Sequence, residues 1–515
     1  MSSYAPGVTG RNSDLLWALH DFSSVERQGR YNLYFNYYMG NHALAFATEK
    51  FRSTFGYVFK EFAENMCGPV VDSLADRLVV TGFKTSEAQT KTEPVDSNVP
   101  TPQPRIAGVP PTPNAPGRKK VTTVDPLGEQ ALEIWRRNNM DERSNEVHTE
   151  SLMMGDSYAI VWPNDNMEAE IWPQYANEVC VQYDPNNQKK ILRAAKVWWD
   201  DFEGRWYLNI YTEVAIQKYL QKGTSRTFNP REESWTQYET VPNPYEVVPV
   251  FHFPNRGRKK HGISELKDVV PLQNAQNKSV MDMIIAMEFA SFKQRWVIGL
   301  EIEYDEATGE PVEQSAKNYG VDRLLSFSDP EVKVGQFDAT DLAQFLKVQD
   351  KFWSSVARVS GTPLHYFFIT QGDFPSGEAM KSAEARFVKK ITDRQTSYGN
   401  VWQDVMLFCM LIDGPAPKED LRIETLWKDA TPRSDSEIAD TAVKKKAVGV
   451  SRSQILKELG YDDETIMRML EESDADAERQ ALTKGGPPEP PNAQAQNPNG
   501  QPRPQSSGTQ GVRRQ

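Results

Sequence analysis

Apolar residues recur at three- and four-residue steps in several long stretches, and this spacing predicts amphipathic helices. Between residues 341 and 361 the recurring positions are Leu342, Phe345, Leu346, Phe352, Trp353, Val356 and Val359. Gly361 and Pro363 then predict a helix end, because glycine accepts a left-handed conformation and proline cannot continue the hydrogen-bond ladder. Another helix is predicted from Ser376 to about Ile412, roughly 54 Å long at 1.5 Å per residue. A helix of that length suggests a strut in an assembly.

A further long helix is predicted between residues 263 and 292, with apolar residues on two faces. One face carries Leu272, Ala275, Val280, Met283 and Met287, and the other carries Met281, Ile284, Ile285, Phe289 and Phe292. Ser264 suits an N-cap, and Pro271 is expected to kink the helix or to reset its start. A helix that is apolar on two faces is buried between neighbours, which are either parts of its own core or other copies of the chain.

The hydrophobic period changes along the first half of the chain. Residues 14–83 and 126–152 show helical spacing, whereas residues 157–253 carry β-branched and aromatic runs separated by turn-forming residues. The second pattern predicts a mostly antiparallel sheet. Helices followed by sheet, without βαβ alternation, indicate an α+β fold. Residues 293–340 are expected to form short strands and turns between two apolar helices.

Three stretches are too polar to bury a core. Residues 85–124 are rich in proline, threonine, serine and asparagine, and they include the basic triplet Arg118-Lys119-Lys120. We expect this stretch to be disordered or a surface excursion, in which the triplet is either solvated or placed to touch phosphate. Residues 1–13 and 483–515 are also expected to be disordered.

The composition narrows the class of protein. The 515 residues suggest about three domains, and the three cysteines, which are far apart, fit a chain made in a reducing cytoplasm. The sequence shows no signal peptide, and its longest apolar run, Val405–Ile412, is too short to cross a bilayer. We therefore expect a soluble protein. The net charge of −12 argues against a broad grip on nucleic acid, but it allows nucleic acid to slide past.

The sequence offers little catalytic chemistry. It contains no phosphate-binding GxxxxGK[ST] loop, no HExxH and no GxSxG. Its scattered histidines are read as structural: His20, His42, His148, His252, His261 and His365. The acidic run from Glu301 to Glu306 has no histidine or basic partner nearby and is read as a solvated strand edge. We predict no catalytic, cofactor-binding or metal-binding residues.

Four segments in a particular order carry a resemblance to a known family. They are His148–Pro163 (HTESLMMGDSYAIVWP), Gly262–Phe292 (GISELKDVVPLQNAQNKSVMDMIIAMEFASF), Ser376–Lys381 (SGEAMK) and Ile423–Leu459. Together they resemble portal proteins of tailed bacteriophages, especially those of long-tailed phages of actinobacteria. The resemblance covers most of residues 14–482 and leaves the insertion at 85–124 unmatched.

The resemblance implies an α+β portal fold with a wing, a two-helix stem, a small α/β clip and a helical crown. The wing would comprise residues 14–262 and 377–430, where the long helix returns to it. The stem helices would be 263–292 and 341–361, with the clip at 293–340 between them. A tunnel loop would follow at 362–376, and the crown would be 431–482.

The resemblance also implies partners and site residues. Portal proteins form rings, usually of twelve copies, at one capsid vertex in the virion, assembled in the host cytoplasm. The partners would be double-stranded DNA, terminase, the major capsid protein and scaffold, and a head–tail adaptor, with no membrane and no cofactor. The loop residues expected to face DNA are His365, Tyr366, Phe367, Phe368, Gln371 and Asp373. The stem residues expected between copies are Leu272, Met281, Met283, Ile284, Met287, Phe345, Phe352 and Trp353.

Several alternatives stay open at the level of sequence. The chain could be a metal-dependent enzyme acting on DNA, which would need a carboxylate set that the sequence does not display. It could also be another virion component, such as a capsid or adaptor protein, although two stem-like helices flanking a small β insert speak against this. Within the loop, the aromatic residues either contact neighbouring loops and the long helix or anchor the loop to its own chain.

Overall fold

The computed structural model describes residues 13–43, 64–86, 89–94, 119–257, 261–291, 295–298, 307, 333–336, 343–367, 377–414, 418, 421–431, 435–459, 461 and 465–473. The chain divides into two compact units, residues 1–431 and residues 432–515. The helices of the first unit are α1 (Ser13–Phe22), α2 (Val25–Tyr38), α4 (Cys67–Ala75), α5 (Pro126–Arg137), α6 (Met140–Met154), α7 (Val270–Ser291), α8 (Ala343–Ser360) and α9 (Gly377–Asp413), with short 3-10 turns η1 (Glu232–Ser234) and η2 (Leu364–Tyr366).

Every strand lies in the first unit and pairs antiparallel with its neighbours among the described residues. The strands are β1 (Val80–Thr85), β2 (Gln89–Pro94), β3 (Lys119–Val124), β4 (Asp156–Pro163), β5 (Ala169–Gln174), β6 (Val179–Tyr183), β7 (Ile191–Asp200), β8 (Arg205–Thr212), β9 (Ala215–Gln221), β10 (Trp235–Pro242), β11 (Val250–Pro254), β12 (Arg295–Ile298), β13 (Lys333–Gln336) and β14 (Ile423–Trp427).

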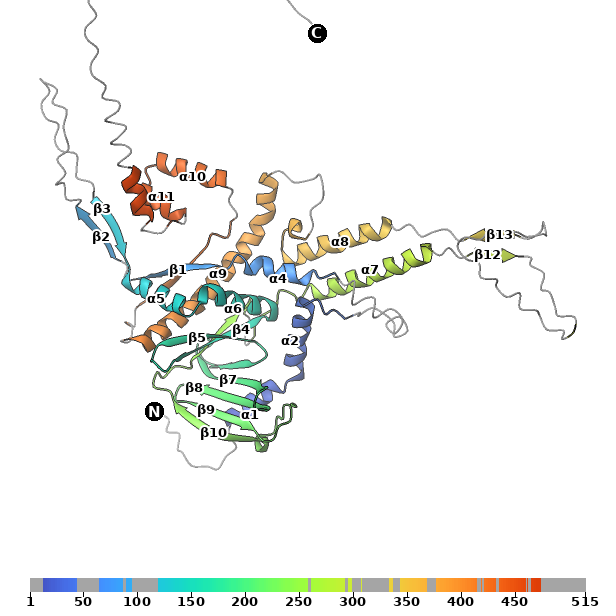
Figure 1. Ribbon diagram of the computed structural model, residues 1–515, viewed down its shortest axis with the longest axis horizontal. Coiled ribbons are helices and arrows are strands. Elements are labelled where there is room, and N and C mark those ends of the chain that lie inside the picture. Colours follow the sequence, from blue (N-terminus) through green and yellow to red (C-terminus); the bar gives the residue numbers. More distant parts are fainter. Residues whose placement is uncertain are drawn as a thin grey trace, which may run out of the picture. The chain divides into compact units, whose positions relative to one another are not determined.

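Two sheets confirm the antiparallel region predicted for residues 157–253. One sheet has the order β10-β9-β8-β7-β6, and the other has the order β11-β4-β5 (Figure 1). Helix α1 packs on the larger sheet, where Leu15, Leu19 and Phe22 share a core with Leu208 and Ile210. The mixture of helices and antiparallel sheets is the predicted α+β class.

The long helix α9 runs through the main core. Its buried residues Phe387, Ile391, Tyr398, Trp402 and Val405 belong to the largest apolar cluster of the chain. Trp402 packs edge-on against Trp135 of α5, with ring centroids 4.9 Å apart. The predicted helices at 341–361 and 376–412 are thus confirmed as α8 and α9. The break between them is confirmed too, since Gly361 has a φ of +74°.

Residues 80–83 were predicted to be helical, and the structure contradicts this. They belong to β1, which pairs with β14, so that Phe83 lies opposite Thr425 and Thr85 opposite Ile423. The alternating pattern of β1 is short, and its partner lies some 340 residues further along the chain. Local periodicity could not reveal that pairing.

Residues 85–124 were expected to be disordered or a surface excursion, and the expectation of disorder was wrong at both ends of the stretch. Strands β2 and β3 form a two-stranded ladder in which Gln89 pairs with Val124 and Pro94 with Lys119. Threonine and valine dominate the paired positions, and β-branched residues favour strands. Residues 95–118, which include Arg118, lie outside the described residues.

The approach to α7 decides between the two expectations for Pro271, and it shows that Ser264 was wrongly predicted as the N-cap, because the helix starts six residues later. The helix begins at Val270, so Pro271 is its second residue and resets the helix start. Proline is tolerated there because the first N–H groups of a helix need no intrahelical partner. Ser264 shapes the preceding turn, where its hydroxyl accepts from the Leu266 amide at 3.0 Å and donates to the Met153 carbonyl.

The second unit contains α10 (Asp435–Ala447), α11 (Arg452–Glu458) and a further helical stretch at 465–473. The Ser451 hydroxyl accepts a hydrogen bond from the Gln454 amide at 3.3 Å. This hydrogen bond is the N-cap half of a capping box.

Candidate functional site: a helix pair and the loop held by α9

Helices α7 and α8 lie side by side and form an arm (Figure 1). The short ladder of β12 and β13 lies beyond the far ends of the helices, with Trp296 opposite Gly335. This confirms a short strand within the stretch 293–340, whereas Glu301–Glu306 lies outside the described residues. On the facing sides of the helices, the Gln349 amide of α8 approaches the Met283 sulfur of α7 at 4.0 Å. The arm is thus two helices joined through a small β tip.

The first two turns of α7 are buried through amide side chains. The Gln273 side chain accepts from the Met66 amide at 2.8 Å and donates to the Glu64 carbonyl at 2.6 Å and to Asn277 Oδ1 at 2.8 Å. Gln276 donates to the Glu64 carboxylate at 3.3 Å. Buried amides require partners in defined directions, so this network fixes how α7 leaves the body. The sequence prediction for this helix rested on its apolar faces alone. The run Gln273-Asn-Ala-Gln-Asn277 could have indicated a buried amide network.

A buried carboxylate ties the start of α7 to α9. Glu265 lies 2.6 Å from Lys390 Nζ, 2.7 Å from Arg394 Nη2 and 3.0 Å from Arg256 Nη2, and its side chain is 1% exposed. Burial alone would raise the pKa of Glu265, but the positive charges, led by Lys390, lower it to about 2. The carboxylate therefore stays charged at neutral pH and holds three separate segments together. The sequence reading did not find this cluster.

Two cations of α9 also cap the end of α8. Lys390 Nζ donates to the Ser360 carbonyl at 2.9 Å, and Arg386 Nη1 donates to the Arg358 carbonyl at 3.4 Å. The last carbonyls of a helix lack intrahelical partners and carry partial negative charge, so cations stabilise them. The loop that begins at Gly361 therefore starts from a fixed point.

The first loop residues are attached to the same chain. His365 Nε2 lies 3.3 Å from Glu384 Oε1 of α9. The Tyr366 hydroxyl is hydrogen-bonded to Arg77, and its ring lies 5.6 Å from the Phe387 ring. Phe367 packs against the main core. Among the loop residues expected to face DNA, these three lie against their own chain, while Phe368, Gln371 and Asp373 lie outside the described residues.

Some of the stem residues predicted to lie between copies are buried within their own chain, and others are partly or largely exposed. Met281 is 1% exposed and is buried within a single chain. Leu272 and Trp353 pack against the main core. Met283, Ile284, Phe345 and Phe352 are half-buried, and Met287 is 48% exposed. The arm also exposes apolar residues that the sequence reading did not select, namely Leu346, Val348 and Val359.

His148 and His252 are buried in the fold. His148 is fully buried, and its Nε2 accepts from Trp402 Nε1 at 3.0 Å. Burial lowers the pKa of His148 to about 3, so the ring is neutral. His252 lies between Asp156 and Tyr183, at 2.9 Å from each. Burial would raise the pKa of Asp156, but hydrogen bonds, first from His252, hold it well below its usual range.

Within the described part of the chain, no group of three or more His, Cys, Asp or Glu residues is arranged to hold a metal ion. No described helix is long and apolar enough to span a membrane. What the arrangement offers is a projecting apolar arm with a rigid base, and a loop that begins beside it.

The family model described as phage portal protein, SPP1 Gp6-like, matches residues 24–479. The chain belongs to this family of phage portal proteins. The portal protein of Mycobacterium phage L5 is 27% identical over 375 residues, which cover 68% of this chain and 74% of that relative. The portal protein of Mycobacterium phage D29 is 27% identical over 376 residues, with the same coverage. The predicted membership of the phage portal family is thereby confirmed.

Solved structures of necks of gene transfer agent (GTA) particles are similar at lower identity. The neck of an empty particle, computed with C6 symmetry, has a TM-score of 0.41 and 14% identity, covering 76% of this chain and 89% of that one. The neck of a native particle, computed with C12 symmetry, has a TM-score of 0.39 and 13% identity, covering 65% of this chain and 84% of that one.

Proposed function

We propose that this portal protein forms a closed ring of about twelve copies at one capsid vertex of a virion. Double-stranded DNA would pass through the ring during packaging and ejection. The observation that carries this proposal is the family match over residues 24–479. The role is mechanical, and ATP hydrolysis would belong to a partner, because the sequence has no phosphate-binding loop.

The arm supports this proposal as the part that meets neighbouring copies. Met287 of α7 and Leu346, Val348 and Val359 of α8 are between 43% and 56% exposed in a single copy. A neighbouring copy that packs against the arm would remove these apolar side chains from water. A ring closes through heterologous contacts, in which each copy offers different surfaces to its two neighbours. A pair of helices with apolar residues on both provides two such surfaces.

The domain assignment belongs to the same proposal. The wing would be residues 14–262 and 377–430, the stem α7 and α8, the clip residues 293–340 and the crown residues 431–482. Terminase would dock at the clip, and the capsid protein, scaffold and head–tail adaptor at other parts of the ring. The loop at 362–376 would approach DNA beyond Phe367. The net charge of −12 favours sliding of DNA through the ring and disfavours tight binding of DNA.

Electron microscopy of the purified protein in negative stain, together with its native mass, tests the ring. We expect particles with a central hole and a mass of about 700 kDa, which is twelve copies of the 58.5 kDa chain. A stable monomer at high concentration would contradict the proposal. If that monomer nicked plasmid DNA only with Mg²⁺ present, the chain would instead be a DNA-processing enzyme.

A loop variant separates conduction of DNA from ring formation. Replacing Phe368 by serine should leave rings intact while lowering the amount of DNA packaged or retained in heads, and Phe367 is left in place because it packs against the main core. Replacing the exposed Tyr238 of β10 by serine serves as the control, because it lies on a different part of the body. Loss of rings in the loop variant would show that Phe368 is needed for folding instead.

A further inference from the structure

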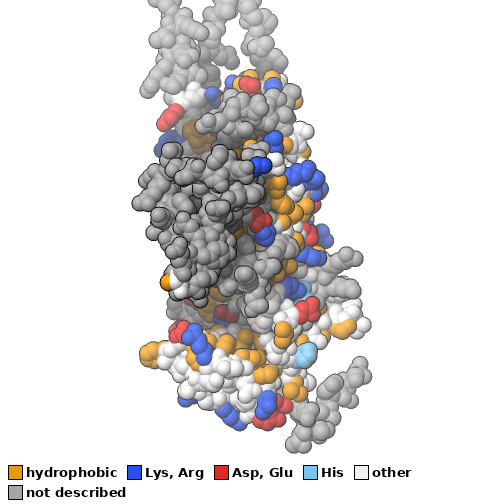
Figure 2. Space-filling view, turned by 90° about the vertical axis from the view of Figure 1, so that its right-hand side faces the viewer, with side chains coloured by type: hydrophobic (Ala, Val, Ile, Leu, Met, Phe, Trp, Pro, Cys, Tyr) orange, Lys and Arg blue, Asp and Glu red, His pale blue; other side chains and the backbone are white. Residues whose placement is uncertain are grey.

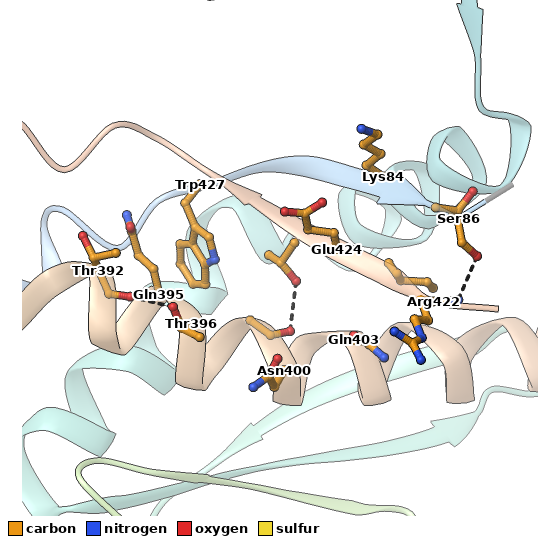
Figure 3. Close-up of a pocket in the computed structure, with 14 residues that line it drawn as sticks. Lys84, Ser86, Thr392, Gln395, Thr396, Asn400, Gln403, Arg422, Glu424 and Trp427 are labelled. Atoms are coloured by element: carbon orange, nitrogen blue, oxygen red, sulfur yellow. Dashed lines mark hydrogen bonds between the residues drawn. The ribbon is translucent and has the colours of Figure 1, made fainter. Parts of the chain in front are cut away.

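A groove of about 740 Å³ lies between α9 and β14 (Figure 3). One wall is the stretch of α9 from Thr392 to Gln403, and the other is β14 from Arg422 to Trp427, with the end of β1 behind it. At 1.5 Å per residue of helix and 3.3 Å per residue of strand, both walls are roughly 16 Å long. That length matches about five residues of extended chain.

No described strand pairs with the edge of β14 beside this groove. The Ser86 amide donates to the Arg422 carbonyl at 2.9 Å, and Lys84 lies opposite Glu424 in the β1–β14 ladder. Because antiparallel backbone groups alternate between the two edges, those of Ile423, Thr425 and Trp427 point away from β1. Among the described strands, only β1 pairs with β14. A two-stranded ribbon is marginally stable alone and gains from a third strand.

The facing side of α9 is polar and uncharged. Thr392, Gln395, Thr396, Asn400 and Gln403 follow one another at steps that keep them on one side of the helix. Hydroxyl and amide groups both donate and accept hydrogen bonds, as a peptide backbone requires. Only Lys84, Arg422 and Glu424 bring charge to the lining, so the groove suits a peptide better than nucleic acid.

The walls are fixed to each other before anything enters. The Thr425 hydroxyl donates to the Gly399 carbonyl at 3.1 Å. A Cβ at Gly399 would lie 3.2 Å from Trp427 Nε1, so the glycine allows the strand to approach the helix this closely. This also explains a glycine in the middle of a helix of 37 residues, where it costs stability. The groove is therefore a preformed site.

We propose that this groove receives an extended segment of a second copy of the chain, which adds a strand to the edge of β14 beside the groove. The inference rests on the proposed ring. Each copy in a ring must offer one neighbour a surface that the other neighbour does not use, and a groove that accepts a strand is such a surface. Its uncharged polar lining is compatible with water before assembly and with backbone hydrogen bonds after it.

Filling the groove tests the proposal. Asn400 and Ser397 are both exposed on α9, and only Asn400 lines the groove. We expect Asn400→Trp to keep the circular dichroism and unfolding midpoint of the wild type, while the protein concentration needed for rings rises about tenfold or more. Ser397→Trp should assemble normally. If Asn400→Trp does not fold, Gln403→Arg, which places a second cation beside Arg422, should show the same assembly defect.

Hydrogen exchange measures directly whether the backbone amides of β14 become hydrogen-bonded in the ring, which the tryptophan variant does not show. The amides of Ile423, Thr425 and Trp427 should exchange more slowly in wild-type rings than in dissociated copies, by a factor of about ten or more. Unchanged exchange at these amides, or normal rings from a folded Asn400→Trp, would overturn the inference. If Asn400→Trp forms normal rings but heads carrying these rings fail to fill with DNA, the inference is also overturned. The occupant of the groove would then be a partner protein. If wild-type protein forms no rings, the proposed function fails first.

Discussion

The two halves of α7 differ in the side chains that they carry: amides in the half next to the body, and methionines in the far half. The half next to the body buries Gln273, Gln276 and Asn277, whose amides form a hydrogen-bond network. The far half carries Met283, which is half-buried, and Met287, which is 48% exposed. Hydrogen bonds depend on direction, whereas apolar contacts depend mainly on the area removed from water. The base of the arm therefore sets its direction, and the far half leaves apolar surface exposed.

The buried Glu265 gives the largest test of the rigid base. Replacing it by alanine leaves Lys390 and Arg394 without a counter-charge in a buried site, which should lower the free energy of unfolding by about 3–5 kcal/mol. Urea denaturation measures this change. The exposed pair Lys389–Asp393, 2.7 Å apart, provides the control, since Asp393→Ala should cost less than about 1 kcal/mol. Equal effects of the two variants would contradict the rigid base.

The same residue predicts a pH dependence. The pKa of Glu265 is lowered from 4.5 in its ordinary state to about 2 in the folded chain. The unfolded chain therefore binds its proton first as the pH falls, so the stabilisation is complete above about pH 4.5 and is lost as the pH falls toward 2. The stability difference between wild type and Glu265→Ala should shrink over this range. A constant difference would show that the carboxylate charge is not what matters.

Gln273 tests the amide network with a smaller effect. Gln273→Ala leaves the Met66 amide and the Glu64 carbonyl without this partner, which should cost about 1–3 kcal/mol. Gln344→Ala on the exposed side of α8 is the matched control, with an expected change within about 0.5 kcal/mol. Thermal and urea unfolding compare the two variants. If Gln273→Ala is as mild as the control, the base of α7 is held by other contacts.

Tyr366 tests the loop anchor and should have the smallest effect. Tyr366→Phe removes the hydrogen bond to Arg77 but keeps the ring against Phe387, so a loss of about 0.5–1.5 kcal/mol is expected. Arg77 retains its bond to the Ala430 carbonyl at 2.9 Å. Tyr238→Phe, on an exposed tyrosine of β10, should change nothing measurable. A larger loss than that of Gln273→Ala would mean that the loop start helps to hold the body.

Local patterns predicted the elements whose signals are local. The spacing of Phe345, Phe352 and Trp353 gave α8, and the Gly361–Pro363 break gave its end. The alternating and aromatic runs between residues 157 and 253 gave the antiparallel strands. Each of these signals lies within one element, so no distant partner was needed to read it.

The remaining features depend on residues far apart in the chain. Glu265 meets Arg394 across 129 positions, and Gln273 meets Glu64 across 209. Strand β1 pairs with β14 some 340 residues further along the chain. Met281 was expected between copies because its apolar face was visible, but the sequence does not say which of two apolar faces the chain itself covers. Long-range pairing, and not the quality of the local pattern, limited the prediction.

The central claim is that the arm forms the wall between neighbouring copies, and a reconstruction of the assembled particle by cryo-electron microscopy tests it most directly. We predict that the side chains of Met287 and Leu346 lie within van der Waals contact, about 4 Å, of a neighbouring copy, with α7 and α8 lining a closed ring. A ring in which both residues face solvent, or a particle containing a single copy, would contradict this account.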